Sequence, residues 1–318
     1  MTVDSRAPAS RTSFQLFTGF AALLLAAGLA GCQSSGDESA DETAPPVVEV
    51  TMADYAFVVP DSIPSGWTTF RVKNEGSEHH NFHLHRLPLP DGRTTEDFRA
   101  AMVAPTDSLM ELYHAGTIDS AEVMKEYAQI VPDWAQTVYQ KREKNGGMAF
   151  LAPERSARTT VKMEPGTYLM HCTLRAPDGQ GHNVLGMRRF FTVTGEQNGA
   201  NPPTADLTAR ISGNELLVDD TLSAGTHTIA FEVEEVAAEM DSAYYAMVAR
   251  LGPDISADSV ASWPYQNPAP TTFLGGFEYI DVRRTPYMTV DLTPGQYIWH
   301  WDYFGADRPH NYKKFVVQ

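Results

Sequence analysis

Short runs in which apolar and polar residues alternate dominate the chain from about residue 47 onward, and Gly and Pro separate them. Such runs include VVEVTMADYAFVV (47–59), GWTTFRVKN (66–74), RTTVKME (158–164) and GTYLMHC (166–172). A period of two predicts strands with one buried face, and many short strands between turn residues are typical of a β-sandwich. The pattern therefore predicts an all-β fold.

Residues 91–145 break this pattern. Their apolar residues recur at helical spacing, and residues that cap helix N-termini precede them. Asp119 and Ser120 can cap one helix, and Thr95 can cap a shorter one. The longer helix would carry Val123, Met124, Tyr127, Ile130 and Val131, and the shorter one Phe98 and Met102. We therefore expect a helical insertion between strands, covering one end of the sandwich.

The second half of the chain repeats the first in degenerate form. The segment GGFEYIDVRRTPYMTVDLTPGQYIWHW (275–301) matches GGMAFLAPERSARTTVKMEPGTYLMHC (146–172) along its full length. A linker rich in Gly, Pro and Asn, GEQNGANPPT (195–204), separates the two copies. An internal duplication with such a linker predicts two tandem sandwich domains, at residues 47–195 and 205–318.

The first 31 residues are typical of a secretory signal. Arg6 and Arg11 precede an apolar run at residues 17–30, which is shorter than the roughly 20 residues that a membrane-spanning helix needs. The run ends in Leu-Ala-Gly-Cys, which resembles the bacterial lipobox and implies cleavage before Cys32 and lipid on that residue. Gln33 stands where aspartate would mark inner-membrane retention, so we expect a bacterial cell-envelope protein anchored in the outer membrane and facing the periplasm.

Residues 32–46 are polar and acidic without apolar periodicity, which predicts a disordered tether between the lipid and the folded chain. Over all 318 residues, 40 acidic and 24 basic residues give a formal net charge of −16 at pH 7. This charge argues against electrostatic binding to nucleic acid, and we expect no nucleic-acid partner. The sequence contains no phosphate-binding loop, nucleophile elbow or paired-carboxylate hydrolase motif.

Cys172 is one of two cysteines in the chain. If Cys32 carries lipid, Cys172 has no internal disulfide partner, and a free thiol in an oxidising compartment points to metal ligation. The alternative is a buried structural cysteine that behaves as a small hydrophobe. His182 and Met187 follow Cys172 on one predicted loop, and His80 lies on an earlier strand. One thiolate, two imidazoles and a thioether suit copper, as a His₂Cys site with a weak axial methionine.

The pair His80-Asn81 and the series Cys172, His182, Met187 resemble the ligand motifs of the cupredoxin superfamily. This resemblance implies Greek-key sandwiches with type 1 copper at one end of the first domain. It also implies electron transfer with a redox partner protein, which the sequence does not identify. Nine residues separate Cys172 from His182, more than in the simple electron carriers of the superfamily.

The second copy has lost this ligand set. Alignment of the copies places Tyr244 at His80, Trp301 at Cys172, Phe315 at Met187 and His310 at His182. We therefore expect no copper in the second sandwich. The aromatic residues Tyr297, Trp299, Trp301 and Tyr303 are expected in its core, whereas His79, His114 and His227 are expected on the surface of the protein.

Further histidines lie on the same strands as the predicted copper ligands. Because strand side chains alternate, His83 and His85 are expected on the face opposite His80, and His171 opposite Cys172. We expect this outward face to be solvated or to form an interface. The alternative is a second metal site at His83, His85 and His171.

The elements H-N-F-H-L-H and H-C also resemble the first domain of copper nitrite reductases and multicopper oxidases. In the nitrite reductases the positions of His85 and His171 bind type 2 copper, and a neighbouring subunit of a homotrimer completes the site. His300 is a candidate third ligand here, although Asp302 stands at the family position. His83 replaces the aspartate that handles substrate protons in that family. The sequence predicts no catalytic residue with which to complete such an enzyme.

Two function classes follow, with a third as a weaker alternative. The first is a lipid-anchored envelope protein that binds type 1 copper and transfers electrons, without being an enzyme. The second is a copper-dependent oxidoreductase with a type 1 and type 2 pair, resembling nitrite reductase. The third is a metal-free interaction module that kept the cupredoxin-like sandwich.

Overall fold

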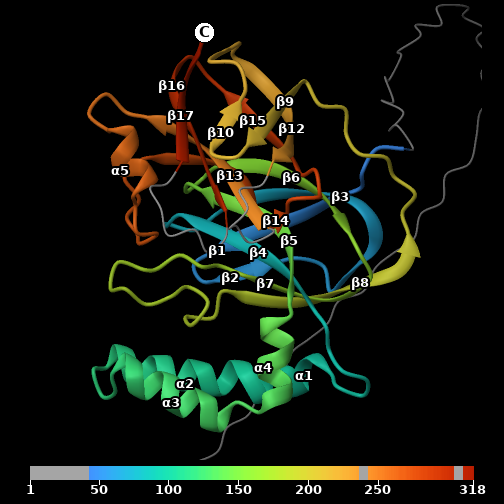
Figure 1. Cartoon of the computed structure of the whole chain (residues 1–318), viewed down its shortest axis with the longest axis vertical. Helices are drawn as coiled ribbons and strands as arrows, with labels where there is room; N and C mark the ends of the chain where they lie inside the picture. Colours follow the sequence, from blue (N-terminus) through green and yellow to red (C-terminus); the bar gives the residue numbers. More distant parts are fainter. Residues whose placement is uncertain (1–42, 236–242, 304–310) are drawn as a thin grey trace, which may run out of the picture. The chain divides into compact units, whose positions relative to one another are not determined.

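The computed structural model of the chain describes residues 43–235, 243–303 and 311–318 (Figure 1). The described residues belong to one compact unit. The predicted signal peptide, Cys32 and most of the acidic tether lie outside the described residues. Among the described residues, no helix is both long enough and apolar enough to cross a membrane.

Eight strands build the first sandwich. They are β1 (Val47–Ala53), β2 (Ala56–Val58), β3 (Ser62–Asn74), β4 (His80–Leu87), β5 (Glu143–Leu151), β6 (Ser156–Met163), β7 (Gly166–His171) and β8 (Arg188–Gln197). One sheet has the order β2-β1-β3-β6, and the other runs from the start of β3 through β8, β7 and β4 to β5. Strand β3 changes sheets at Gly66, whose φ of 116° is a conformation that favours glycine.

The second sandwich repeats this pairing pattern. Its strands are β9 (Leu207–Ser212), β10 (Glu215–Leu217), β11 (Thr221–Leu222), β12 (Gly225–Glu235), β13 (Ala243–Leu251), β14 (Thr272–Asp281), β15 (Tyr287–Leu292), β16 (Gly295–Tyr303) and β17 (Asn311–Val317), with a short helix α5 (Ala257–Ala261). Strand β9 pairs in parallel with β12 as β1 does with β3, and β13 lies between β14 and β16 as β4 lies between β5 and β7. The predicted all-β fold of two sandwiches is confirmed.

Edge strands join the two sandwiches in both sheet layers. Strand β5 pairs with β14, and β6 pairs with β15 over Thr160↔Tyr287 to Arg158↔Thr289. A single hydrophobic core runs through both halves, and the rings of Phe150 and Phe273 meet across the junction with 5.4 Å between their centroids. The predicted linker therefore connects halves that share one core.

The predicted helical insertion is confirmed. It contains α1 (Thr95–Phe98), a π-helical turn (Arg99–Val103), α2 (Ala104–His114), α3 (Ser120–Ile130) and α4 (Asp133–Gln140), gathered on one side of the first sandwich (Figure 1). Asp119 caps α3 and forms a capping box with Glu122. The cap of α1 is Thr94, so the prediction of Thr95 was wrong by one residue.

The insertion packs against the outward face of β4 and β7. Its buried residues Phe98, Met102 and Val138 form a second hydrophobic cluster with Leu87 of β4 and Leu169 of β7. Because side chains alternate along strands, Leu87 lies on the same face as His83 and His85, and Leu169 lies on the same face as His171. The helices thus cover part of the strand face that carries these histidines.

A repeated glycine pair allows the central strands to approach each other. Gly147 of β5 has φ of 134°, and a Cβ there would collide with the Phe82 carbonyl of β4. Gly276 of β14 has φ of 151° and would collide with the Ala246 carbonyl of β13. The same constraint therefore acts at equivalent positions of the two sandwiches.

We expect Gly147→Ala to lower the free energy of unfolding by about 2–5 kcal/mol, because it adds backbone strain to overpacking. Urea unfolding measures the change. Gly195→Ala is the matched control, since Gly195 is exposed in β8 with no heavy atom within 4 Å of an added Cβ. The control should stay within about 0.5 kcal/mol of the parent protein. Equal stability of the two variants would contradict this account of the β4–β5 contact.

Candidate metal centre

The predicted copper ligands meet at one end of the first sandwich. His80 is the first residue of β4, Cys172 directly follows β7, and Met187 directly precedes β8. Three backbone hydrogen bonds fold the intervening loop: Cys172 N–H donates to Met187 O, Met187 N–H to His182 O, and His182 N–H to Leu174 O, at 3.1, 2.8 and 2.9 Å. The loop thus returns His182 and Met187 to the strand end that carries Cys172.

Donor atoms of three of these residues converge. Nδ1 of His80 lies 3.0 Å from Nδ1 of His182, which lies 3.4 Å from Sγ of Cys172. Both separations are less than two metal–ligand bonds of about 2.0–2.3 Å, so one ion can contact the atoms of each pair. Among the described residues, these three form the one group of His, Cys, Asp or Glu whose ligand atoms all lie within 4.8 Å of one another. Met187 is fully buried in the same core.

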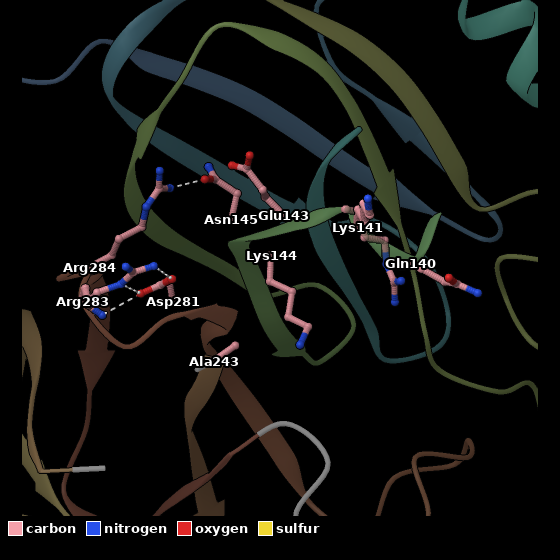
Figure 2. Close-up of a pocket in the computed structure, with 10 residues that line it drawn as sticks. Gln140, Lys141, Glu143, Lys144, Asn145, Ala243, Asp281, Arg283 and Arg284 are labelled. Atoms are coloured by element: carbon pink, nitrogen blue, oxygen red, sulfur yellow. Dashed lines mark hydrogen bonds and ion pairs between the residues drawn. The ribbon is translucent and has the colours of Figure 1, made fainter. Parts of the chain in front are cut away.

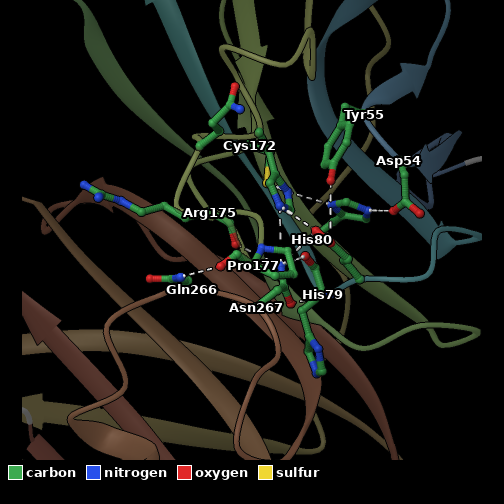
Figure 3. Close-up of polar contacts among 12 residues, drawn as sticks. Asp54, Tyr55, His79, His80, Cys172, Arg175, Pro177, Gln266 and Asn267 are labelled. Atoms are coloured by element: carbon green, nitrogen blue, oxygen red, sulfur yellow. Dashed lines mark hydrogen bonds and ion pairs between the residues drawn. The ribbon is translucent and has the colours of Figure 1, made fainter. Parts of the chain in front are cut away.

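Each of the two imidazoles contacts a carboxylate through its Nε2 atom. Asp54 Oδ1 lies 2.6 Å from Nε2 of His80, and Glu78 Oε2 lies 2.9 Å from Nε2 of His182. Figure 3 shows Asp54 beyond the His80 ring, on the side away from Cys172. Partial burial opposes ionisation of Asp54, but hydrogen bonds from Ser77 and His80 lower its pKa to about 2. An ionised carboxylate only accepts, so His80 donates Nε2–H and turns the lone pair of Nδ1 inward.

The Nδ1 lone pairs of His80 and His182 face each other, and this arrangement favours a cation between them. Burial lowers the pKa of His80, although Asp54 partly opposes this, and burial lowers the pKa of His182 to about 4. Both rings are therefore neutral at pH 7. With Nε2–H directed to the carboxylates, both Nδ1 atoms are acceptors only 3.0 Å apart. A metal ion between them removes this repulsion, so the residues fit a metal of the copper type.

Asn81 connects Cys172 to the second sandwich. The Cys172 thiol donates to Asn81 Oδ1 at 3.1 Å, and burial raises the pKa of that thiol to about 12. The Asn81 amide donates to Thr173 Oγ1 at 2.9 Å and to Glu278 Oε1 at 2.8 Å. Glu278 belongs to β14, so the second half of the chain positions a residue that touches the thiol.

Sequence reasoning missed Asp54, Glu78 and Glu278. Glu78 was visible two residues before His80, but its direction was not. Glu278 stands where the first copy has Ala149, and a charged residue between Phe277 and Tyr279 in an apolar strand segment was a usable signal. His79 was wrongly expected on the surface. Its ring packs against Phe273 with 5.8 Å between centroids, and burial lowers its pKa to about 4.

The second sandwich lacks the ligand set in its described residues. Strand pairing places Tyr244 at the position of His80 and Trp301 at that of Cys172, as expected. In the strand register, however, Phe315 of β17 pairs with Tyr297 of β16, as Phe191 of β8 pairs with Tyr168 of β7. The counterpart of Met187 is therefore Asn311, and the predicted Phe315 was wrong. The hairpin register decides this, and the sequence alignment had slipped by four residues. His310 lies outside the described residues. The predicted core residues Tyr297, Trp299, Trp301 and Tyr303 are all buried.

The outward histidines come together, but they are not solvated. His83, His85 and His171 are only 7%, 4% and 8% exposed, and their ring centroids lie 5.1–5.7 Å apart. Their face is covered by Tyr139 of α4, by Arg142 between α4 and β5, and by Tyr245, Glu278 and Tyr279 of the second sandwich. Of the two expectations for this face, solvated or interface, the first was wrong, because the face forms an interface within the chain. Alternation along the strands assigns side chains to a face without showing what covers it. His300 is buried and contacts the Tyr245 hydroxyl through Nε2 at 3.1 Å.

No family model matches the chain, and no curated protein does. Among solved structures, the chain is similar to an auracyanin from Roseiflexus castenholzii, at 19% identity over 48% of this chain and 98% of that chain, with a TM-score of 0.24. It is also similar to auracyanin A, a "blue" copper protein from Chloroflexus aurantiacus, at 17% identity over 47% of this chain and 99% of that chain, with a TM-score of 0.26.

A copper-containing nitrite reductase from Thermus scotoductus is similar over 86% of this chain and 62% of that chain, at 10% identity and a TM-score of 0.20. Identities and TM-scores this low carry no information about function. The chain's own strand order and ligand positions define its class. It is a tandem of two cupredoxin-like sandwiches, and the first of them has a His, Cys and His group that can hold a metal.

We expect metal binding at pH 7.5 to release about one proton per ion, because only the Cys172 thiol must ionise. Its pKa of about 12 keeps it protonated before binding, whereas His182, with a pKa of about 4, is already neutral. Titration calorimetry with Zn²⁺, which does not oxidise thiols, measures the proton count when repeated in buffers of different ionisation enthalpy. Cys172→Ser should release none. A count near zero or near two for the parent protein would refute the assigned protonation states.

Proposed function

We propose that the first sandwich binds a single type 1 copper ion through His80, Cys172, His182 and Met187 and that the protein transfers electrons. The observation that carries the proposal is the pair of inward-facing Nδ1 atoms 3.0 Å apart beside a buried thiol. A neutral site with two imidazoles, one thiol and one thioether matches the donor set of blue-copper centres.

Copper at this site would supply a one-electron redox couple, and the protein's residues keep the ligands fixed and dry. Asp54 and Glu78 orient the imidazoles. Tyr55 lies edge-on against His182 with 4.9 Å between centroids, and Asn267 of the second sandwich approaches His182 Nε2 to 3.4 Å. These groups shield the ligands from water. Ligands that stay in place lower the reorganisation energy of electron transfer.

Partly exposed carboxylates lie near this site. Asp54 and Glu78 have partly exposed side chains, and both act with Asp178 on Tyr55, raising its pKa after the larger effect of burial. Together with the net charge of −16, this favours a redox partner protein with a basic surface, because opposite charges accelerate encounter.

The parent protein loaded with copper should show an intense visible band from Cys172 thiolate-to-copper charge transfer, with about one copper per chain. Cys172→Ser should abolish the band while the sandwich stays folded by circular dichroism. Met187→Leu is the matched variant: it conserves volume, and it should retain a band while changing the reduction potential. A colourless copper-loaded parent protein would remove the type 1 assignment.

A second candidate function is a copper oxidoreductase with another copper at His83, His85 and His171, in the manner of a trimeric nitrite reductase. One observation favours it. His85 Nδ1 and His171 Nε2 are buried without a hydrogen-bond partner among the described residues. Against it, the ring nitrogens of this cluster do not converge as those at the first site do. A second copper per chain that is lost in a His85→Gln, His171→Gln double variant would establish this alternative.

We also propose that lipid on Cys32 anchors the protein to the outer membrane on its periplasmic side. The support is the lipobox-like Leu-Ala-Gly-Cys after a short apolar run. The polar segment that follows would act as a flexible linker between the lipid and the folded unit.

Cys32→Ser should move the protein from the membrane to the soluble fraction, because several acyl chains hold a protein firmly and no other anchor is proposed. Fractionation of cells that express the parent and variant proteins measures this change. Gln33→Ser, which leaves the lipidated position intact, is the control and should stay with the membrane. Firm membrane attachment of processed Cys32→Ser protein would contradict the anchor.

A further inference from the structure

A basic cavity lies where the two sandwiches meet. It has a volume of about 810 Å³, and its lining includes Lys141, Arg142 and Lys144 from the first half and Arg283 and Arg284 from the second. Figure 2 shows Lys144 reaching toward Ala243, with Arg283 and Arg284 on the opposite wall. Among the described lining residues, the two carboxylates are already engaged. Asp281 pairs with Arg283, and Glu143 pairs with Arg86.

Two cations of this lining, Arg142 and Arg284, have neutral hydrogen-bond partners and give the described part of the cavity an excess of positive charge. Arg284 bonds to neutral partners, the Asn145 side chain and the Lys162 carbonyl. Arg142 bonds to the Tyr139 carbonyl, and its Nε is buried without a hydrogen-bond partner among the described residues. In a chain with a net charge of −16, such a local excess is unusual and attracts anions.

Arg142 and Lys144 also line a second, inner cavity of about 270 Å³, so the two cavities share a wall. The inner cavity contains His83, His85 and His171. The Arg142 guanidinium acts electrostatically on His83 and His85, where it adds to the larger effects of burial and of the neighbouring histidines in lowering their pKa values. The positive charge therefore reaches the histidine cluster.

The acidic groups that line the inner cavity in the described residues are mostly uncharged at neutral pH. Tyrosine side chains line it, and burial raises the pKa of Tyr245 and Tyr279, so they keep their hydroxyl protons. Glu278 is the one carboxylate among the described lining residues, and burial raises its pKa to about 8. A neutral carboxyl can donate, and His83 Nε2 lies 3.3 Å from Glu278 Oε2. At neutral pH the described lining thus carries the cations Arg142 and Lys144 and little negative charge.

We propose that the inner cavity binds a small oxygen-bearing anion, a short carboxylate or an inorganic oxyanion, which enters through the basic cavity. Arg142 supplies the charge, and its free Nε–H supplies a charge-assisted hydrogen bond. His85 Nδ1 and His171 Nε2, which have no described partner, supply further contacts. The observations favour an anion over a metal cation, because the guanidinium repels a cation and the ring nitrogens do not converge on one point. The site does not depend on copper in the first sandwich.

The test is calorimetric titration of the chelator-treated full chain with sodium acetate, nitrate and sulfate, each alone, at pH 7 and constant ionic strength. The three probes separate carboxylate from inorganic oxyanion and planar from tetrahedral shape. We expect saturable binding of at least one probe with one site per chain. Arg142→Gln should weaken it at least about tenfold, the loss expected for one charge-assisted hydrogen bond. Arg142→Lys should retain more affinity than Arg142→Gln, and His85→Leu should also weaken binding.

Arg71→Gln is the charge-matched control, since Arg71 pairs with Glu49 on the exposed surface. It should change affinity less than about twofold, because exposed charges are screened. Circular dichroism establishes that each variant is folded. The proposal is overturned if no probe binds saturably or if folded Arg142→Gln binds like the parent. It is also overturned if anions bind only after a second equivalent of Cu²⁺ or Zn²⁺, which would make the cavity a metal site.

Discussion

The edge-to-edge pairing of the two sandwiches is the constraint on which the rest of the structure depends. Because β5 pairs with β14 and β6 with β15, both sheet layers continue from one half into the other. This places β14 beside the ligand-bearing strands and closes the strand face that carries the outer histidines. The first sandwich alone, with its helical insertion, would leave open to water the part of that face that the second sandwich covers.

The same pairing gives the half without metal ligands a role in the candidate metal centre. Glu278 holds Asn81, which contacts the Cys172 thiol, and Asn267 approaches His182. The second sandwich lacks the ligand set in its described residues, but its residues still contact the candidate metal centre and help to shield it from water. Both halves also keep the Gly-Gly pair that lets their central strands approach, so they preserve one backbone geometry with different side-chain chemistry.

Burial organises the electrostatics of this junction in two ways. At the metal centre, carboxylates behind neutral imidazoles direct lone pairs inward, which suits a cation. In the inner cavity, neutral histidines lie beside Arg142, and the one carboxylate among the described lining residues is protonated at neutral pH, which suits an anion. His83 Nε2 lies 3.3 Å from Glu278, so the two environments meet at one side chain of the second sandwich.

The strands, the helical insertion, the duplication and the candidate ligands His80, Cys172 and His182 could all be predicted from the sequence. Each of these depends on local periodicity, capping chemistry or the order of donor types along one segment. Only the tertiary structure shows which groups contact the candidate ligands and what covers the strand face that carries the outer histidines. Asp54, Glu78 and Glu278 reach the site from separate segments. The register of β16 and β17, rather than the alignment, makes Asn311 the residue equivalent to Met187 in the second copy. Alternation along β4 and β7 correctly separated the outer histidines from the ligands. Their burial followed only from the packing of α4 and β14 against that face, a long-range contact that no local pattern records.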